Sequence, residues 1–313
     1  MIRRSRLFAL LMLVLASVVG CGDTGSPTGE TPQTTDPEGP LSIYVVNYPL
    51  QYFAARIGGE EVEVVFPAPA DVDPAFWSPN AEIVTAYQQA DLILLNGAGY
   101  AKWIAMASLP QAAKVDTSAA FADRLIPLES AVTHAHGPEG AHEHGDLAFT
   151  TWLDPTLAIE QARAVARALE RARPAQAESF RLSLDELTAE LTDLDRRLAA
   201  VAERLGSEPL LFSHPVYQYL IRRYDLNGRS LHWEPDLAPD LDDLTQALED
   251  HPARWMIWEA DPLPGTVETL NGVGIASVVF APCGRAPETG DLISEMERNV
   301  SRLEAGLRPA SSP

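Results

Sequence analysis

The longest regular pattern of apolar and polar positions runs from Pro174 to Leu205. Leucine and valine recur there at alternating steps of three and four residues, which places them on one stripe of an α-helix. The stripe consists of Leu184, Leu187, Leu191, Leu194, Leu198, Val201 and Leu205. Pro174 suits a first helical position, and Gly206 suits the residue just after a helix. The pattern predicts one long helix over 174–205, and a coiled-coil dimer is the alternative use of such a stripe.

Short β-branched runs alternate with helical patterns on both sides of this helix. Before it, we expect strands at 41–46, 62–66, 92–95 and 114–116, and helices at 51–57, 80–89, 99–107 and 157–171. After it, we expect strands at 209–212, 229–232, 255–258 and 275–280, and helices at 215–224, 241–248, 266–270 and 291–306. Such alternation is typical of parallel sheets with helices on both faces, whose ligands bind beyond the carboxyl ends of the strands.

We therefore predict an α/β fold of two lobes, each a small parallel sheet flanked by helices. The one long rigid helix is the only connection that the pattern predicts between the lobes. The expected order is an N-terminal lobe over 41–155 with a His-rich loop at 133–145, connecting helices over 156–206, and a C-terminal lobe over 207–308.

The first residues have the composition of a leader. Arg3, Arg4 and Arg6 precede an apolar run over 7–19, which is typical of an export signal and short for a membrane span. The run ends in Val-Val-Gly-Cys, which resembles a bacterial lipobox with Cys21 as the lipidated residue. We predict a signal peptide over 1–20 and, because 22–40 is rich in Gly, Thr and Pro, a flexible tether over 21–40.

Composition and charge narrow the possible partners. The 313 residues are 46% hydrophobic, which is enough for two lobes with cores of their own. Removal of the three leader arginines would take the net charge from −21 to −24, which disfavours nucleic acid and anionic lipid surfaces as partners. A lipidated Cys21 would leave Cys283 without an intrachain disulfide partner. The chain is expected in the cell envelope, attached to the membrane through lipid only and facing the periplasm or the exterior.

The chain contains no motif of a nucleotide-binding or hydrolytic enzyme. It has no G-x-G-x-x-G, no G-x-x-x-x-G-K and no G-x-S-x-G. Two facing lobes without such a motif favour a ligand-binding receptor, so we predict no catalytic residues, no enzymatic cofactor and no enzymatic activity.

Several short motifs together carry a family resemblance. They are Tyr44–Leu50, Ile57–Gly59, Ala90–Leu92, Asn96–Gly97 with Trp103, Trp152–Pro155, Ser213–His214 with Tyr217 and Tyr219, and Glu259 after a strand. As a set they resemble the substrate-binding lipoproteins of bacterial zinc and manganese ABC importers. The resemblance implies a monomer that captures a divalent metal ion, zinc before others, between its lobes and delivers it to an ABC permease.

The same resemblance implies a ligand set of three histidines and an acid in the cleft. Carried over position by position, it assigns those four places to Ala75, Thr150, His214 and Ala281. Only His214 has the expected side chain. Because losing even one residue that supports a ligand typically costs about 10–100-fold in metal affinity, we expect the tight site of the family to be lost or rearranged.

Three arrangements remain open from the sequence. In the first, one or more of Cys283, Glu259, Glu234 and His232 join His214 in an altered site. In the second, the His-rich loop binds zinc through His134, His136, His142 and His144, as many zinc-specific relatives carry such a loop, and the protein is an envelope zinc buffer without a role in transport. In the third, aromatic residues line the cleft for an organic or chelated-metal ligand. These residues are Phe76, Trp77, Trp152, Trp233 and Trp258.

Overall fold

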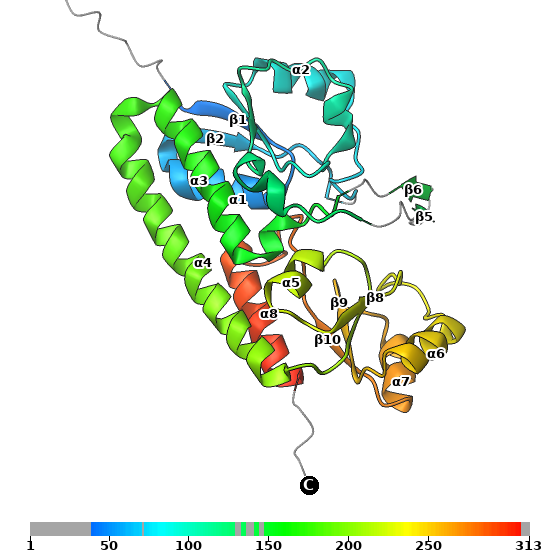
Figure 1. Cartoon of the computed structure of the whole chain (residues 1–313). Coiled ribbons are helices and arrows are strands. Elements are labelled where there is room, and N and C mark those ends of the chain that lie inside the picture. Colours follow the sequence, from blue (N-terminus) through cyan, green and yellow to red (C-terminus); the bar gives the residue numbers. More distant parts are fainter. Residues whose placement is uncertain (1–38, 71, 129–132, 136–140, 144–146, 308–313) are drawn as a thin grey trace, which may run out of the picture. The chain divides into compact units, whose positions relative to one another are not determined.

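The computed structural model describes residues 39–70, 72–128, 133–135, 141–143 and 147–307. They form two α/β lobes, each built on a four-stranded parallel sheet (Figure 1). The N-terminal sheet has the order β2-β1-β3-β4, from β1 (Leu41–Val45), β2 (Val62–Val65), β3 (Leu92–Leu95) and β4 (Lys114–Asp116). The C-terminal sheet has the order β10-β9-β7-β8, from β7 (Leu210–Phe212), β8 (Gly228–Ser230), β9 (Trp255–Trp258) and β10 (Ala276–Val279). The predicted fold class is confirmed.

Two helices of the N-terminal lobe begin at asparagine caps. The Asn47 side chain accepts a hydrogen bond from the Leu50 amide at 3.2 Å and starts α1 (Tyr48–Gly58). Asn80 does the same for α2 (Ala81–Gln89). A cap of this kind pairs one of the amides that a helix otherwise leaves without a partner.

The predicted α-helix over 99–107 is wrong. Only a short 3-10 turn, η2 (Lys102–Ala105), forms there. Within that range the backbone of Gly99 and Ala101 has positive φ, at 74° and 56°, which an α-helix does not tolerate. Two further 3-10 turns, η1 (Gly59–Glu61) and η3 (Ala119–Arg124), complete the regular structure before residue 128.

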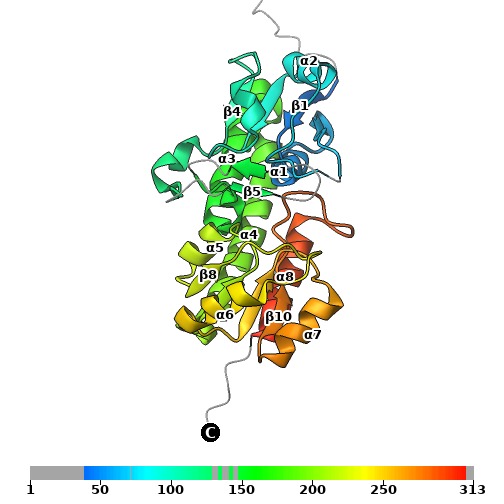
Figure 2. The same cartoon turned by 90° about the vertical axis from the view of Figure 1, so that its right-hand side faces the viewer.

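The two lobes share a layer of long helices. After the short turn η5 (Thr151–Leu153), α3 (Pro155–Ala172) leads through the 3-10 turn η6 (Pro174–Gln176) into α4 (Ala177–Leu205). The long helix therefore begins three residues later than predicted. Its leucine stripe is buried inside the chain except for Leu184, which is partly buried, and α4 packs against α1, α3 and α8 (Figures 1 and 2). The stripe is therefore part of the core of this chain and is not available to pair with a second helix in a coiled coil.

The remaining helices cover the C-terminal sheet. They are α5 (Gln218–Arg223), α6 (Leu241–Asp250), α7 (Pro264–Gly272) and α8 (Leu292–Gly306). Asp291 and Ser294 form a reciprocal capping box that fixes the start of α8. Because α8 lies along both α4 and β10, it fastens the C-terminal sheet to the helix layer.

A second connection between the lobes is the segment over 280–285, which we name the interlobe strap. Its first residues bond to the C-terminal lobe, where the Tyr217 hydroxyl donates to the Phe280 carbonyl at 2.7 Å. Its later residues bond to the N-terminal lobe, where the Trp152 indole donates to the Pro282 carbonyl at 2.6 Å and the Tyr48 amide donates to the Gly284 carbonyl at 3.1 Å. The expectation that only the long helix joins the lobes is therefore wrong.

A third connection is made by Tyr219 on α5. Its buried hydroxyl donates to the Ala148 carbonyl at 2.9 Å and accepts from the Ile126 amide at 3.3 Å. The Ala148 amide in turn donates to the Ile126 carbonyl at 2.9 Å. One side chain of the C-terminal lobe thus ties together two segments of the N-terminal lobe that lie on either side of the His-rich region.

The His-rich region contains two short antiparallel strands where an irregular loop was expected. These are β5 (Thr133–Ala135) and β6 (Ala141–Glu143). The predicted leader, its Cys21 and all of the tether before Gly39 lie outside the described residues. Within the described part of the chain, no helix combines the length and apolar character needed to cross a membrane.

Candidate metal centre

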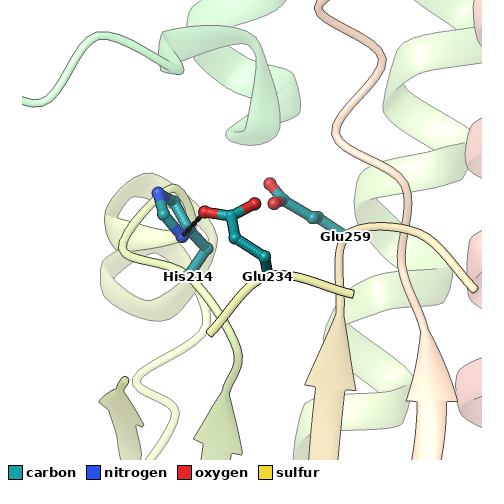
Figure 3. Close-up of side chains that lie close together, drawn as sticks. All are labelled: His214, Glu234 and Glu259. Carbon is teal, nitrogen blue, oxygen red and sulfur yellow. Dashed lines mark ion pairs between the residues drawn. The ribbon is translucent and has the colours of Figure 1, made fainter. Parts of the chain in front are cut away.

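Three side chains meet at the carboxyl edge of the C-terminal sheet. His214 lies two residues after β7, Glu259 lies directly after β9, and Glu234 ends the extended segment that comes after β8 (Figure 3). Because neighbouring parallel strands end at the same edge, the residues just beyond them are brought together although they are far apart in sequence.

Backbone hydrogen bonds continue beyond the strands and fix this edge. The Ser213 amide donates to the Ile257 carbonyl at 2.8 Å, and the Trp233 amide donates to the Ser213 carbonyl at 2.8 Å. The residue before His214 is therefore held between the chain segment that carries Glu259 and the one that carries Glu234. The strand order β9-β7-β8 accounts for the placement of all three side chains.

The three side chains have the geometry of a metal-binding group. One ligand atom from each of His214, Glu234 and Glu259 lies within 4.8 Å of the others. His214 Nδ1 lies 3.5 Å from Glu234 Oε1, and the side chains point toward one another in Figure 3. His214 is only 5% exposed, whereas both glutamates are partly buried.

The electrostatics of the site favour a cation. Burial raises the pKa of the Glu259 carboxyl to about 8, and the carboxylates of Glu234 and Asp73 contribute to the shift in the same direction. A carboxyl group in this environment holds its proton because its charged form is poorly solvated and repelled by its neighbours. A divalent cation between these groups would favour the ionised form, so binding would release protons.

The other three positions implied by the family resemblance bear no metal-ligating side chain. Ala75 is buried, and its amide donates to Asp73 Oδ1 at 2.9 Å. The Thr150 hydroxyl donates to the Val216 carbonyl at 2.5 Å, so it is engaged with the main chain just beyond His214. The Ala281 amide donates to Asn299 Oδ1 at 3.0 Å. All of the described groups that cluster as ligands therefore come from the C-terminal lobe.

The structure shows which of the four candidate residues lie together with His214 in the altered site. Glu234 and Glu259 lie in the ligand group with His214. His232 lies beside it, with its ring centroid 6.2 Å from that of His214, but is not a member. Cys283 is not a member either; burial and the nearby Glu295 raise the pKa of its thiol to about 12. The signal in the sequence for both glutamates was their position after predicted strands.

For the predicted ligands of the His-rich loop, the structure gives at most the pairing of the backbone. His134 and His142 are opposite each other in the backbone register of β5 and β6. His136, His144 and Cys21 lie outside the described residues.

The aromatic candidates divide into two groups. Trp233 and Trp258 are buried in the core of the C-terminal lobe, with ring centroids 6.3 Å apart. Phe76 packs edge-on against Phe149 at 6.2 Å in the N-terminal lobe, where Trp152 is buried and Trp77 is partly buried. The two core tryptophans are thus accounted for by packing.

Known proteins resemble this chain along most of its length. "Zinc-binding protein AdcA" of Streptococcus pyogenes serotype M3 (strain ATCC BAA-595 / MGAS315) is 22% identical over 288 residues, which cover 85% of this chain and 56% of AdcA. The chain therefore spans little more than half of that relative. "Metal ABC transporter substrate-binding lipoprotein" of Lactococcus lactis subsp. lactis (strain IL1403) is 22% identical over 327 residues, which cover 98% of this chain and 99% of the relative.

A solved structure and a family model agree with the fold. The crystal structure of the metal-dependent lipoprotein YcdH from Bacillus subtilis matches with a TM-score of 0.73 at 21% identity, covering 85% of this chain and 99% of YcdH. At that identity the likeness shows the fold alone. The family model matches residues 43–306, which include both lobes and the helix layer between them. The chain belongs to the family described as "Zinc-uptake complex component A periplasmic" (ZnuA).

Proposed function

We propose that this protein is the solute-binding lipoprotein of a metal uptake system and that it captures a divalent metal ion, zinc before others, through His214, Glu234 and Glu259. The observation that carries the proposal is the convergence of these three ligand atoms within 4.8 Å at one sheet edge. The family membership supports it, as do the names of the relatives, one of which is a zinc-binding protein and the other a lipoprotein of a metal ABC transporter.

The proposed role involves binding and delivery without catalysis. A lipid on Cys21 would hold the protein in the cell envelope, and an ABC permease in the membrane would receive the metal. One imidazole with two carboxylates is a ligand set that zinc accepts, although it offers fewer nitrogen donors than three histidines and one acid. We therefore expect zinc to bind less tightly than it would to that fuller set.

Calorimetric titration with Zn²⁺ tests this function. The titration compares the wild type with His214→Ala, Glu259→Gln and a deletion of residues 133–145. Wild type and the deletion variant are expected to share one class of site, and both point variants are expected to lose at least about 10-fold in affinity for it. His232→Ala is the matched control, since it removes a neighbouring imidazole that is outside the ligand group.

The opposite pattern would support the non-transport alternative. If the deletion abolished all zinc binding while His214→Ala changed nothing, the His-rich loop would be the binding element and the cleft receptor would be rejected. If wild type bound no divalent metal, the proposed function itself would fail.

A further inference from the structure

The turn that carries His214 receives a hydrogen bond from the other lobe. The Thr150 hydroxyl donates to the Val216 carbonyl at 2.5 Å, and the Val216 amide donates to the His214 carbonyl at 2.9 Å. Thr150 and His214 are both buried. The main chain of Val216 thus links a side chain of the N-terminal lobe to the histidine of the metal-binding group.

The two ends of this turn are fixed by different parts of the molecule. At its start the sheet holds Ser213, whose amide donates to the main chain of β9 at 2.8 Å. Pro215 disfavours an α-helical backbone at His214, because the proline ring crowds the residue before it. At the end of the turn, Thr150 holds Val216. The position of the imidazole relative to the two glutamates therefore depends on both lobes.

A buried polar network fixes the segment that carries Thr150. The Asn96 side chain, directly after β3, donates to the Phe149 carbonyl at 2.9 Å. The Gln161 side chain on α3 accepts from the Thr151 hydroxyl at 3.2 Å and donates to Asn96 Oδ1 at 3.2 Å. The residues on both sides of Thr150 are thus bonded to one network. Buried polar groups that are paired in this way make a segment rigid.

The chemistry of Thr150 suits positioning better than ligation. Threonine is not among the side chains that usually bind zinc, which are those of cysteine, histidine, aspartate and glutamate. Its hydroxyl has a single proton, and that proton is donated to the Val216 carbonyl. Thr150 therefore bonds to the main chain of the segment that carries a ligand.

We propose that Thr150 is a positioning residue for metal binding, because its hydroxyl holds the turn that places His214 beside Glu234 and Glu259. The inference rests on the proposed function, since it concerns the same ion. The N-terminal lobe then contributes to zinc affinity by fixing a ligand of the other lobe. Loss of a group that orients a ligand typically costs about 10–100-fold in metal affinity. Because Thr150 acts through the main chain, we expect a loss at the lower end of that range.

Thr150→Val removes the hydroxyl and keeps the shape of the side chain. In calorimetric titration with Zn²⁺, this variant is expected to lose about 10-fold in affinity. Thr150→Ser keeps the hydroxyl and is expected to bind zinc like the wild type. Tyr224→Phe is the control for a general loss of stability, since it removes a hydroxyl that donates to Asp195 and makes no bond to the turn. Its melting temperature is expected to fall while its zinc affinity stays unchanged.

Hydrogen exchange in the metal-free proteins tests the positioning itself. The Val216 amide, which donates to the His214 carbonyl, is expected to exchange faster in Thr150→Val than in the wild type and in Thr150→Ser. If Thr150→Val lost zinc affinity without any change at this amide, the hydroxyl would act in another way, such as by binding the ion directly. The inference would then be wrong.

Further outcomes separate this inference from the proposed function. If folded Thr150→Val bound zinc as tightly as the wild type while His214→Ala lost zinc, the inference would fail and the C-terminal site would stand. If the wild type bound no divalent metal, both would fail. If Tyr224→Phe lost as much zinc affinity as Thr150→Val, general destabilisation would explain the loss and the inference would be rejected.

Thr150→Ala provides a second test should Thr150→Val not fold. It removes the same hydroxyl from a smaller side chain, so the same loss of zinc affinity and the same faster exchange at Val216 are expected. A folded Thr150→Ala protein with the zinc affinity of the wild type would contradict a positioning role.

Discussion

At the scale of single residues, the metal centre depends on the side chains located just beyond each strand. His214 could be identified from the sequence because it comes after a serine at a predicted strand end in a recognisable motif. Glu234 and Glu259 could only be candidates, because the strand order that makes them neighbours of His214 depends on contacts between distant segments.

Cys283 allows a prediction about protonation. Burial and Glu295 raise the pKa of its thiol to about 12, whereas an unfolded chain has a cysteine pKa of about 8.5. At pH 8 the native thiol is therefore expected to react with a disulfide reagent far more slowly than the denatured thiol, because the thiolate is the nucleophile. A soluble form that begins after Cys21 contains no other cysteine, so the thiol count reports on this site alone.

The same shift predicts the direction of a pH effect on stability. Between about pH 8.5 and 12 the unfolded chain has lost the thiol proton and the native chain still holds it, so rising pH favours unfolding. Below that range Cys283 contributes no pH dependence. Cys283→Ser is expected to fall less in melting temperature between pH 8 and 10 than the wild type. Equal slopes in the two proteins would contradict the assigned environment of the thiol.

At the scale of elements, periodic segments were predictable and irregular ones were not. The strand over 255–258 was predicted with its observed bounds, and the leucine stripe of α4 gave the long helix, because both depend on local patterning. The predicted helix over 99–107 does not form because Gly99 and Ala101 have positive φ, and an alanine such as Ala101 gives no sequence signal for that conformation. The interlobe strap could not be anticipated, since its bonds join main-chain groups of segments far apart in the chain.

The Tyr219 contact leads to a prediction at this scale. Tyr219→Phe removes the hydroxyl that accepts from the Ile126 amide and donates to the Ala148 carbonyl. Since buried polar groups then lose a partner, the free energy of unfolding is expected to fall by about 1–3 kcal/mol. Hydrogen exchange at the Ile126 amide is expected to accelerate more than at Ala148, whose amide keeps its carbonyl partner.

The matched control for that variant is Tyr224→Phe. Tyr224 is also on the C-terminal lobe, but its hydroxyl donates to Asp195 on α4, away from the His-rich region. Its loss should lower stability without exposing Ile126. Equal exchange rates at Ile126 in the wild type and Tyr219→Phe would show that the hydroxyl does not fasten this segment.

At the scale of the whole molecule, the two lobes are joined by more than one route. The helix layer of α3, α4 and α8 spans both lobes, the strap bonds to each of them, and Tyr219 makes a further link. A receptor with a single flexible hinge would close widely around its ligand. Several parallel connections oppose such a rotation, because all of their hydrogen bonds would have to rearrange together.

We therefore expect metal binding to leave the lobes nearly fixed. X-ray scattering of the zinc-loaded and chelator-treated forms should give radii of gyration within about 1 Å of each other, as for other preorganised binding proteins. Trp152→Phe removes the bond from the indole to the strap and serves as the comparison, with a larger difference expected between its two forms. If the radius of gyration of the wild type decreased by several ångströms on zinc binding, the hydrogen bonds of the strap and of Tyr219 would have to break or rearrange when zinc binds. The receptor would then close by a hinge despite its several connections.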